Sequence, residues 1–254
     1  MVRPKKHLGQ HFLNDHNIAK NIAYSLEDEG DEIVFEVGPG TGILTEYLQE
    51  RYNGRLKLFE IDGESIPVLN SRFPQLSDSI IHGDFLKIQM REYAEGRIII
   101  AGNFPYNISS QILFKVLDNQ DKVSQVVCML QKEVAQRIAS PPGSKDYGIL
   151  SVLLQTYYSI EYLFTVSEQV FFPPPKVKSG VIRMKRNSRK AEDFDGSLFK
   201  AIVKTAFNQR RKTLNNSLKS ILGDRKLEPV IGMKRAENLS VEDYLKLTIE
   251  LKIQ

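Results

Sequence analysis

The sequence contains little cysteine and histidine, and this limits the kinds of site it can build. Its single cysteine, Cys128, excludes an intramolecular disulfide and a zinc site made of cysteines. The four histidines, at positions 7, 11, 16 and 82, lack the spacing of metal ligands. We therefore predict that the protein holds no metal.

Long apolar segments are also missing. No stretch approaches the roughly 18 residues that a membrane-spanning helix needs. The charged segment Met1–Lys6 is not followed by an apolar core, so export is not indicated. We expect a cytoplasmic protein without a membrane partner. With 254 residues, 41% of them hydrophobic, the chain can form one large domain, or one domain with a small appendage.

Positive charge is present and is unevenly distributed. The net charge is only +4, yet residues 204–235 carry nine Lys or Arg against Asp224 and Glu228. The first twenty residues carry four Lys or Arg against Asp15 alone. A basic segment near each end indicates a polyanionic partner. Solvated helix faces are the alternative explanation of such charge clusters.

Apolar runs alternate with segments of helical periodicity, which predicts βαβ units and a mostly parallel sheet with helices on both faces. The expected strands are 33–37, 56–61, 79–82, 97–101 and 125–130, and the expected helices are 43–51, 65–73 and 109–117. Residues 157–166 and 177–185 have β-type composition and flank the proline-rich segment 171–175. We expect these two segments to close the sheet as an antiparallel hairpin. The predicted class is thus α/β and Rossmann-like, with a small all-helical C-terminal domain.

The polar segment 186–195 is interpreted as a linker. Beyond it, helices are expected at 198–207, 213–222 and 241–251, the last with Ser240 as N-cap and Asp243 three residues later. The predicted domains are therefore 1–187, which is Rossmann-like with a basic N-terminal arm, and 188–254, which is helical.

A glycine-rich loop follows the first expected strand. Gly38, Gly40 and Gly42 follow Glu36 in the spacing G-x-G-x-G, and not in the G-x-G-x-x-G spacing of dinucleotide binders. Glycines allow a tight turn and let backbone N–H groups approach a ligand closely. The pattern suits S-adenosylmethionine, which has no pyrophosphate to bind. A glycine-rich turn without a ligand remains the alternative.

Carboxylates follow the next two strands. Glu60 lies twenty-two residues after Gly38, where a ribose diol is usually held. Asp84 follows the third strand and could accept a hydrogen bond from the donor's adenine amine, with Phe85 packed on the ring. Singly, each of these acids fits a surface or capping role. Together with the glycine loop they predict a site for the methyl donor.

The segment Asn103–Tyr106 supplies the acceptor side. The Asn103 side-chain oxygen and the Pro105 carbonyl could accept hydrogen bonds from an adenine amine and stabilise the charge that develops on it during methyl transfer. Tyr106 would stack on the base. An ordinary strand-to-helix turn is the alternative. Methylation of cytosine C5 is not indicated, because it requires a thiolate and Cys128 lies within the apolar segment 126–130.

Phe171 precedes three prolines that stiffen the backbone. It could close the pocket over a flipped base. A buried packing role is equally consistent with the sequence.

Together these motifs resemble the KsgA/RsmA family of small-subunit (16S) rRNA adenine N6,N6-dimethyltransferases over nearly the whole chain. The matching segments are Gly9–Asn14, Glu36–Gly42, Glu60–Asp62, Asn103–Tyr106, Phe171–Val177, Phe207–Leu214 and Arg235–Ser240. The resemblance implies S-adenosylmethionine as methyl donor and two adjacent adenosines near the 3′ end of 16S rRNA as substrate, within an assembling 30S subunit.

The resemblance also implies roles for particular residues. The methyl donor would contact His11, Leu13, Gly38, Gly40, Glu60, Asp84, Phe85 and Asn103. The basic arm and tail would bind rRNA phosphates through Lys5, Lys6, Arg210, Arg211 and Lys212. We expect a monomer, because no exposed heptad or long apolar stripe is evident.

Three alternatives differ in their predictions. An Erm-type methyltransferase of large-subunit (23S) rRNA, which confers macrolide resistance, would share the site, although Gly38–Gly40, Asn107 and Phe207–Leu214 fit the KsgA family better. A non-catalytic rRNA-binding assembly factor would tolerate loss of Asn103 or Tyr106, and both are present. A nicotinamide oxidoreductase would need a different glycine spacing.

Overall fold

The computed structural model describes residues 2–253. Residue 1 of the first predicted domain and residue 254 of the second lie outside the described residues. The chain forms two compact units, residues 1–135 with 160–186, and residues 136–159 with 187–254. The chain passes from one unit to the other after residues 135, 159 and 186, and the predicted domain boundary after residue 187 lies beside the last of these crossings. Residues 136–159, which the prediction placed in the first domain, group with the second unit.

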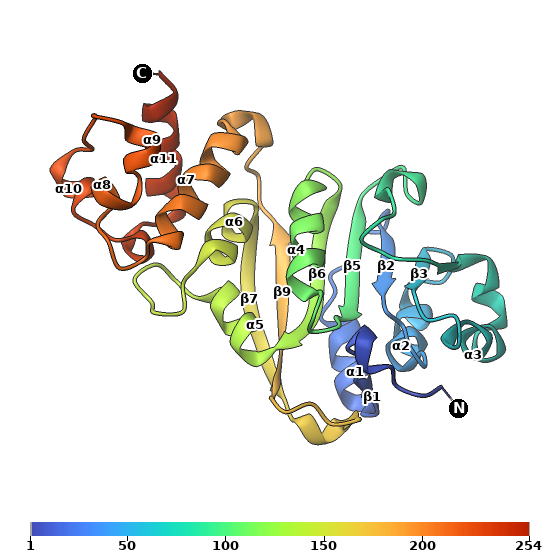
Figure 1. Ribbon diagram of the computed structural model, residues 1–254. Helices are drawn as coiled ribbons and strands as arrows, with labels where there is room; N and C mark the ends of the chain where they lie inside the picture. Colours follow the sequence, from blue (N-terminus) through green and yellow to red (C-terminus); the bar gives the residue numbers. More distant parts are fainter. Residues whose placement is uncertain (1, 254) are drawn as a thin grey trace. The chain divides into compact units, whose positions relative to one another are not determined.

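The first unit contains the predicted sheet. Its strands are β2 (Ile33–Val37), β3 (Leu56–Glu60), β4 (Ile80–His82), β5 (Ile98–Asn103), β6 (Val123–Gln131), β7 (Tyr158–Val166) and β9 (Ser179–Arg186). Their order is β4-β3-β2-β5-β6-β9-β7, and the labelled strands follow one another from β3 to β7 in Figure 1. The strands from β4 to β6 are parallel, whereas β9 pairs antiparallel with β6. The α/β prediction with antiparallel closing strands is confirmed.

The helices of this unit are α1 (His16–Tyr24), α2 (Ile43–Arg51), α3 (Ser65–Arg72), α4 (Ser109–Asp118) and the start of α5 (Lys132–Ala139). Sequence analysis missed α1, α5 and a small antiparallel pair, β1 (Phe12–Leu13) with β8 (Phe171–Phe172). That pair joins segments about 160 residues apart, and strands of two residues leave no periodicity to detect. It fixes the N-terminal arm beside the proline-rich segment.

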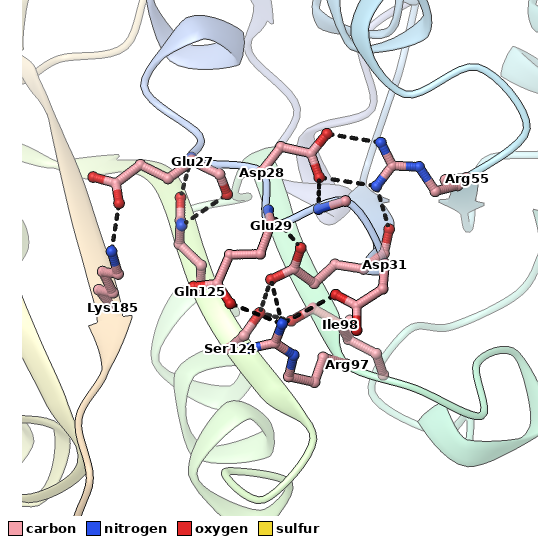
Figure 2. Close-up of polar contacts among 12 residues, drawn as sticks. Glu27, Asp28, Glu29, Asp31, Arg55, Arg97, Ile98, Ser124, Gln125 and Lys185 are labelled. Atoms are coloured by element: carbon pink, nitrogen blue, oxygen red, sulfur yellow. Dashed lines mark hydrogen bonds and ion pairs between the residues drawn. The ribbon is translucent and has the colours of Figure 1, made fainter.

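Ion pairs and one buried amide hold the amino ends of the strands. Arg55 contacts Asp28 at 2.7 Å, and Arg97 contacts Glu29 at 2.8 Å. The Gln125 amide donates to the Glu27 carbonyl at 3.2 Å and accepts from the Glu27 N–H at 3.0 Å (Figure 2). These contacts tie residues 27–31 to the starts of β3, β5 and β6. The opposite, carboxyl edge of the sheet is left for the residues of the candidate site.

The second unit is helical. It contains the end of α5 together with α6 (Ile149–Tyr157), α7 (Gly196–Asn208), α8 (Leu214–Ser217), α9 (Lys219–Leu222), α10 (Pro229–Gly232) and α11 (Val241–Ile253). The expected helix 213–222 is interrupted at Leu218, which ends α8 and caps α9. The predicted cap of the last helix is present, because Ser240 Oγ accepts the Asp243 N–H and the Asp243 carboxylate accepts the Ser240 N–H.

Residues 140–147 pack within this unit and not with the sheet. The Gly143 N–H donates to the Glu237 carbonyl at 2.7 Å, and the Tyr147 ring lies 6.2 Å from that of Phe207. Contacts between residues so far apart in the sequence leave no local pattern that would predict this grouping. Across residues 2–253, no helix combines the length and the apolar character that crossing a membrane requires.

Candidate active site

A cleft lies at the carboxyl ends of β2 and β5, where the order of the parallel strands changes direction. In open α/β sheets, ligands bind at this topological switch point. The cleft is lined by Leu8–Phe12 of the arm, Gly38 and Gly40, Glu60 and Ile61, and Asn103–Tyr106. The structure thus brings together four segments that sequence analysis assigned to one site.

The glycine loop has the backbone conformation that its sequence predicts. Gly38 and Gly40 have φ values of 69° and 57°, in the left-handed region that favours glycine. A Cβ atom on Gly40 would lie 3.0 Å from the Phe12 ring. The loop therefore approaches the arm as closely as glycine allows.

Glu60 ends β3 and is buried beneath this loop. One of its carboxylate oxygens accepts the Gly40 N–H at 2.8 Å, and the other accepts the Asp62 N–H at 2.8 Å. Burial raises the pKa of Glu60, while these backbone hydrogen bonds oppose the shift. Each oxygen retains a lone pair, so the carboxylate can also accept hydrogen bonds from a diol in the cleft.

Glu36 lies in β2, two residues before Gly38, and is almost completely buried. Thr45 donates a hydrogen bond to it at 2.7 Å. Burial raises the pKa of Glu36 to about 8, with a smaller contribution from nearby Glu60. Glu36 is therefore largely neutral at pH 7, which removes one negative charge from beneath the glycine loop.

Asn103 is the last residue of β5, which extends two residues beyond the predicted strand. Its amide nitrogen donates to the His11 carbonyl at 2.9 Å. This bond fixes the orientation of the amide. Among the described residues, the Asn103 side-chain oxygen has no hydrogen-bond donor, so it is available to a group in the cleft.

The last two residues of the segment Asn103–Tyr106 are also held by hydrogen bonds. The Pro105 carbonyl accepts the Ile108 N–H at 3.1 Å, which leaves one lone pair for a second donor. The Tyr106 hydroxyl lies 2.6 Å from Ser179 Oγ, and its ring centroid lies 5.5 Å from that of His11. The Tyr106 ring is thus held from both its hydroxyl end and its side.

The N-terminal arm is bound to the sheet by polar contacts on both sides of the cleft. Asp62 accepts hydrogen bonds from Lys5 at 2.6 Å and from Gln10 at 2.9 Å. Burial alone would raise the pKa of Asp62, but the bonds from Lys5 and Gln10 hold it below its ordinary value. On the other side, His11 Nδ1 donates to the Pro173 carbonyl at 2.7 Å. The arm is therefore part of the cleft wall.

Some predicted residues do not line this cleft. Leu13 and Phe171 pair across β1 and β8 and belong to the buried hydrophobic core, with Phe171 only 4% exposed. Leu13 does line a smaller hollow with Gly38 and Asn103. The structure therefore gives Phe171 a packing role and does not bring it to the cleft, because the strand pairing directs its side chain into the core.

Asp84 and Phe85 follow β4. Asp84 accepts the Leu86 N–H at 3.0 Å, and buried Phe85 packs its ring 5.5 Å from that of Phe59. Neither residue is among those that line the cleft. Contact of these two residues with a methyl donor stays a prediction.

The predicted RNA-binding residues differ in their partners. Lys6, Arg211 and Lys212 are exposed. Lys5, however, is paired with Asp62 and with Glu64 at 3.1 Å, and Arg210 is paired with Glu237 at 3.4 Å. Lys5 and Arg210 therefore stabilise the protein's own structure, which limits their capacity to bind phosphate.

Sequence analysis missed three residues that support the site, namely Gln10, Asp62 as the anchor of the arm, and Ser179. Gln10 lies within the matched N-terminal motif, which was a usable signal. Ser179 contacts Tyr106 from 73 positions away, and no local pattern indicates such a contact. Within residues 2–253, no group of three or more His, Cys, Asp or Glu side chains is arranged to hold a metal ion.

The amino-acid sequence matches a known protein family. A family model described as ribosomal RNA adenine dimethylase matches residues 1–252. A protein of Cytophaga hutchinsonii named ribosomal RNA small subunit methyltransferase A is 54% identical, over 97% of this chain and 96% of its own. A protein of the same name from Bacteroides fragilis is 52% identical, over 99% of this chain and 93% of its own.

Solved structures agree on the fold. A dimethyladenosine transferase from Plasmodium falciparum superimposes with a TM-score of 0.82 at 23% identity, covering 96% of this chain and 98% of its own. The 23S rRNA methyltransferase ErmE gives a TM-score of 0.72 at 24% identity, covering 95% of this chain and 99% of its own. At these identities the likeness concerns the fold alone.

Proposed function

The chain belongs to the ribosomal RNA adenine dimethylase family, and from that premise we propose that it methylates N6 of two adjacent adenosines near the 3′ end of small-subunit rRNA. The methyl donor is S-adenosylmethionine, and each adenosine receives two methyl groups. The names of the relatives above 50% identity support the small-subunit rRNA as substrate. The likeness to ErmE, at 24% identity, gives no comparable support for a large-subunit substrate.

The observation that carries the proposal is the Asn103 amide. Its nitrogen is engaged by the His11 carbonyl at 2.9 Å, and its oxygen is left as an acceptor in the cleft. A transition state in which an adenine amine gains positive charge is stabilised by such a fixed acceptor, which needs no reorganisation during the reaction.

The residues at the other side of the cleft fit the methyl donor. The Glu60 carboxylate suits the ribose diol, and the open backbone of Gly38 and Gly40 suits close approach of a ligand. Asp84 and Phe85 would contact the adenine of the donor. Bound S-adenosylmethionine supplies an electrophilic methyl group on a sulfonium sulfur.

Methyl transfer then proceeds through the acceptor residues. The adenine N6 lone pair forms a bond to the methyl carbon as the carbon–sulfur bond breaks, and the positive charge passes to N6. The Asn103 oxygen and the second lone pair of the Pro105 carbonyl accept the two N6–H groups. Tyr106 stacks on the base and holds it in line. The product ammonium loses one proton to water. The monomethylated amine then carries a single N6–H, so only one of the two acceptors holds it in the second transfer, and the first methyl group takes the place of the other N6–H.

Binding of the RNA is assigned to exposed basic residues of both units, Lys6 in the first and Arg211 and Lys212 in the second, with smaller contributions from Lys5 and Arg210. We assign the protein to the cytoplasm as a monomer that acts on assembling 30S subunits. A non-catalytic binding factor is disfavoured, because such a factor has no need of the hydrogen bonds that fix Asn103 and Tyr106.

The proposal is tested by where the protein adds methyl groups. Purified small and large ribosomal subunits that lack these methyl groups are incubated separately with the protein and labelled S-adenosylmethionine. Label in small-subunit rRNA alone is expected. Label in large-subunit rRNA, or particle binding without any label, contradicts the proposal.

A further inference from the structure

A second hollow adjoins the cleft on the acceptor side and has no role in the reaction described above. It has a volume of about 510 Å³, within the range of sites that bind small organic ligands. Tyr106 lines both the cleft and this hollow, and so do Gly9, Gln10 and His11. The remaining wall comes from Pro4 and Lys6 of the arm, from Gln131 and from Pro173–Val177.

The Gln131 amide is the polar group that distinguishes this hollow. Gln131 ends β6 directly opposite Ser179 of β9, and side chains of such cross-strand neighbours lie on one face of the sheet. Ser179 in turn holds the Tyr106 hydroxyl at 2.6 Å. The half-buried Gln131 amide makes no hydrogen bond to another residue within 2–253, so both its donor and its acceptor are free for a ligand.

Charge indicates what kind of ligand the hollow takes. Lys6 and Lys176 are exposed at its rim, and none of the residues that line it is acidic. Two cations beside an aromatic ring and a free amide match one nucleotide, whose phosphate pairs with lysine and whose base presents hydrogen-bonding edges. A glutamine amide can bond bidentately to N6 and N7 of adenine.

We propose that this hollow holds the second adenosine of the substrate pair while the first is in the cleft, and that Gln131 reads its base. The inference rests on the proposed function, which requires two adjacent adenosines. Tyr106 forms the wall shared by the two nucleotides, and Lys6 and Lys176 bind the phosphates of the second. Gln131 is therefore a specificity-determining residue for the neighbouring base and takes no part in methyl transfer.

The test changes the protein and the neighbouring base together. Small subunits are assembled with rRNA in which one adenosine of the pair is replaced by uridine, and the rate of methylation of the other is measured in a single turnover. For the unmodified protein, the uridine should slow methylation by a factor of about 5 to 150, because that is the discrimination that one bidentate contact to a base provides. For Gln131→Leu, methylation should be slow with either neighbour, and the uridine should cause no further loss.

A second variant and a control separate recognition from folding. Gln131→Glu keeps the size of the side chain but removes its donor, so it should also lose the preference for adenosine. Gln49→Leu, a half-buried glutamine of α2, should behave as the unmodified protein. Affinity for S-adenosylmethionine should be equal in all four proteins.

The inference is overturned if uridine slows Gln131→Leu as much as it slows the unmodified protein, or if Gln131→Leu keeps the full rate. Either result leaves the proposed function intact, since the unmodified protein is then active. Absence of methylation by the unmodified protein on the native pair would instead reject the proposed function.

Discussion

At the residue scale, the site depends on polar groups fixed by partners that are distant in sequence. Asn103 is oriented by the backbone of residue 11, and Tyr106 by the hydroxyl of Ser179. The types and order of the reacting residues are visible in the sequence. Their orientation is not, because it is set by single hydrogen bonds across the fold.

Phe171 shows why a residue type alone is an ambiguous signal. Both a pocket-closing and a packing role were consistent with an aromatic residue before prolines. The pairing of β8 with β1 buries Phe171 and leaves neighbouring Phe172 58% exposed, which favours the packing role. Strand pairing of two-residue segments has no local sequence pattern.

Glu36 leads to a prediction about pH. Its pKa is raised to about 8 in the folded protein, against about 4.5 for an exposed carboxyl. Between these values the folded state binds more protons than the unfolded state, so stability falls as the pH rises. Glu36→Gln lacks this effect. From pH 6 to pH 8.5 the unmodified protein should lose about 2.5 kcal/mol of unfolding free energy relative to the variant.

Urea unfolding of both proteins at the two pH values measures this difference, and other titrating groups cancel in the comparison. Parallel changes in the two proteins would mean that Glu36 is already ionised at pH 6.

At the element scale, most of the sheet was predictable and its edges were not. Strands β2, β3, β5 and β6 are apolar runs buried on both faces, and their positions follow from composition. The position of β9 between β6 and β7 could not be predicted, because amino-acid composition does not specify the order of strands in a sheet. Helix α5 was missed because it begins directly where β6 ends, without a turn signal between them.

The amino ends of the strands give a prediction about stability. Gln125 is 4% exposed, and its amide bonds both backbone groups of Glu27. Gln125→Leu leaves those two groups without partners, which should cost about 2–3 kcal/mol of unfolding free energy. Gln89→Leu, at an exposed position, should change it by less than about 0.5 kcal/mol. Equal stability of the two variants in urea would show that the bonds of Gln125 contribute nothing.

At the scale of the whole molecule, the chain passes more than once between its two units. Residues 136–159 belong to the helical unit although they lie between strands of the sheet. Sequence analysis expected a linker only at 186–195, because it looked for a change in amino-acid composition. The two earlier crossings lie inside α5 and β7, where the composition does not change in this way. Arg210 secures this arrangement within the second unit, bonding Glu237 and the carbonyl of Ser144.

The basic tail gives a prediction about RNA binding. Arg211 and Lys212 are exposed, so the double variant Arg211→Ala with Lys212→Ala should weaken binding to small subunits. It should also reduce the slope of log affinity against log salt by about 1.5. Arg210→Ala should mainly lower stability, because Arg210 already has protein partners. Titration of labelled particles at several salt concentrations measures the slope. A larger change for Arg210→Ala than for the double variant would reverse the assignment.

The most direct test of the account is the modified nucleoside made by the unmodified protein and by Asn103→Ala. Small-subunit rRNA treated with each protein and S-adenosylmethionine is digested to nucleosides and analysed by mass spectrometry. The unmodified protein should yield N6,N6-dimethyladenosine. Asn103→Ala should yield almost none while its affinity for the donor falls only a few-fold, since the amide acts on the acceptor amine. Dimethyladenosine from Asn103→Ala at a near-normal rate would contradict the proposed site.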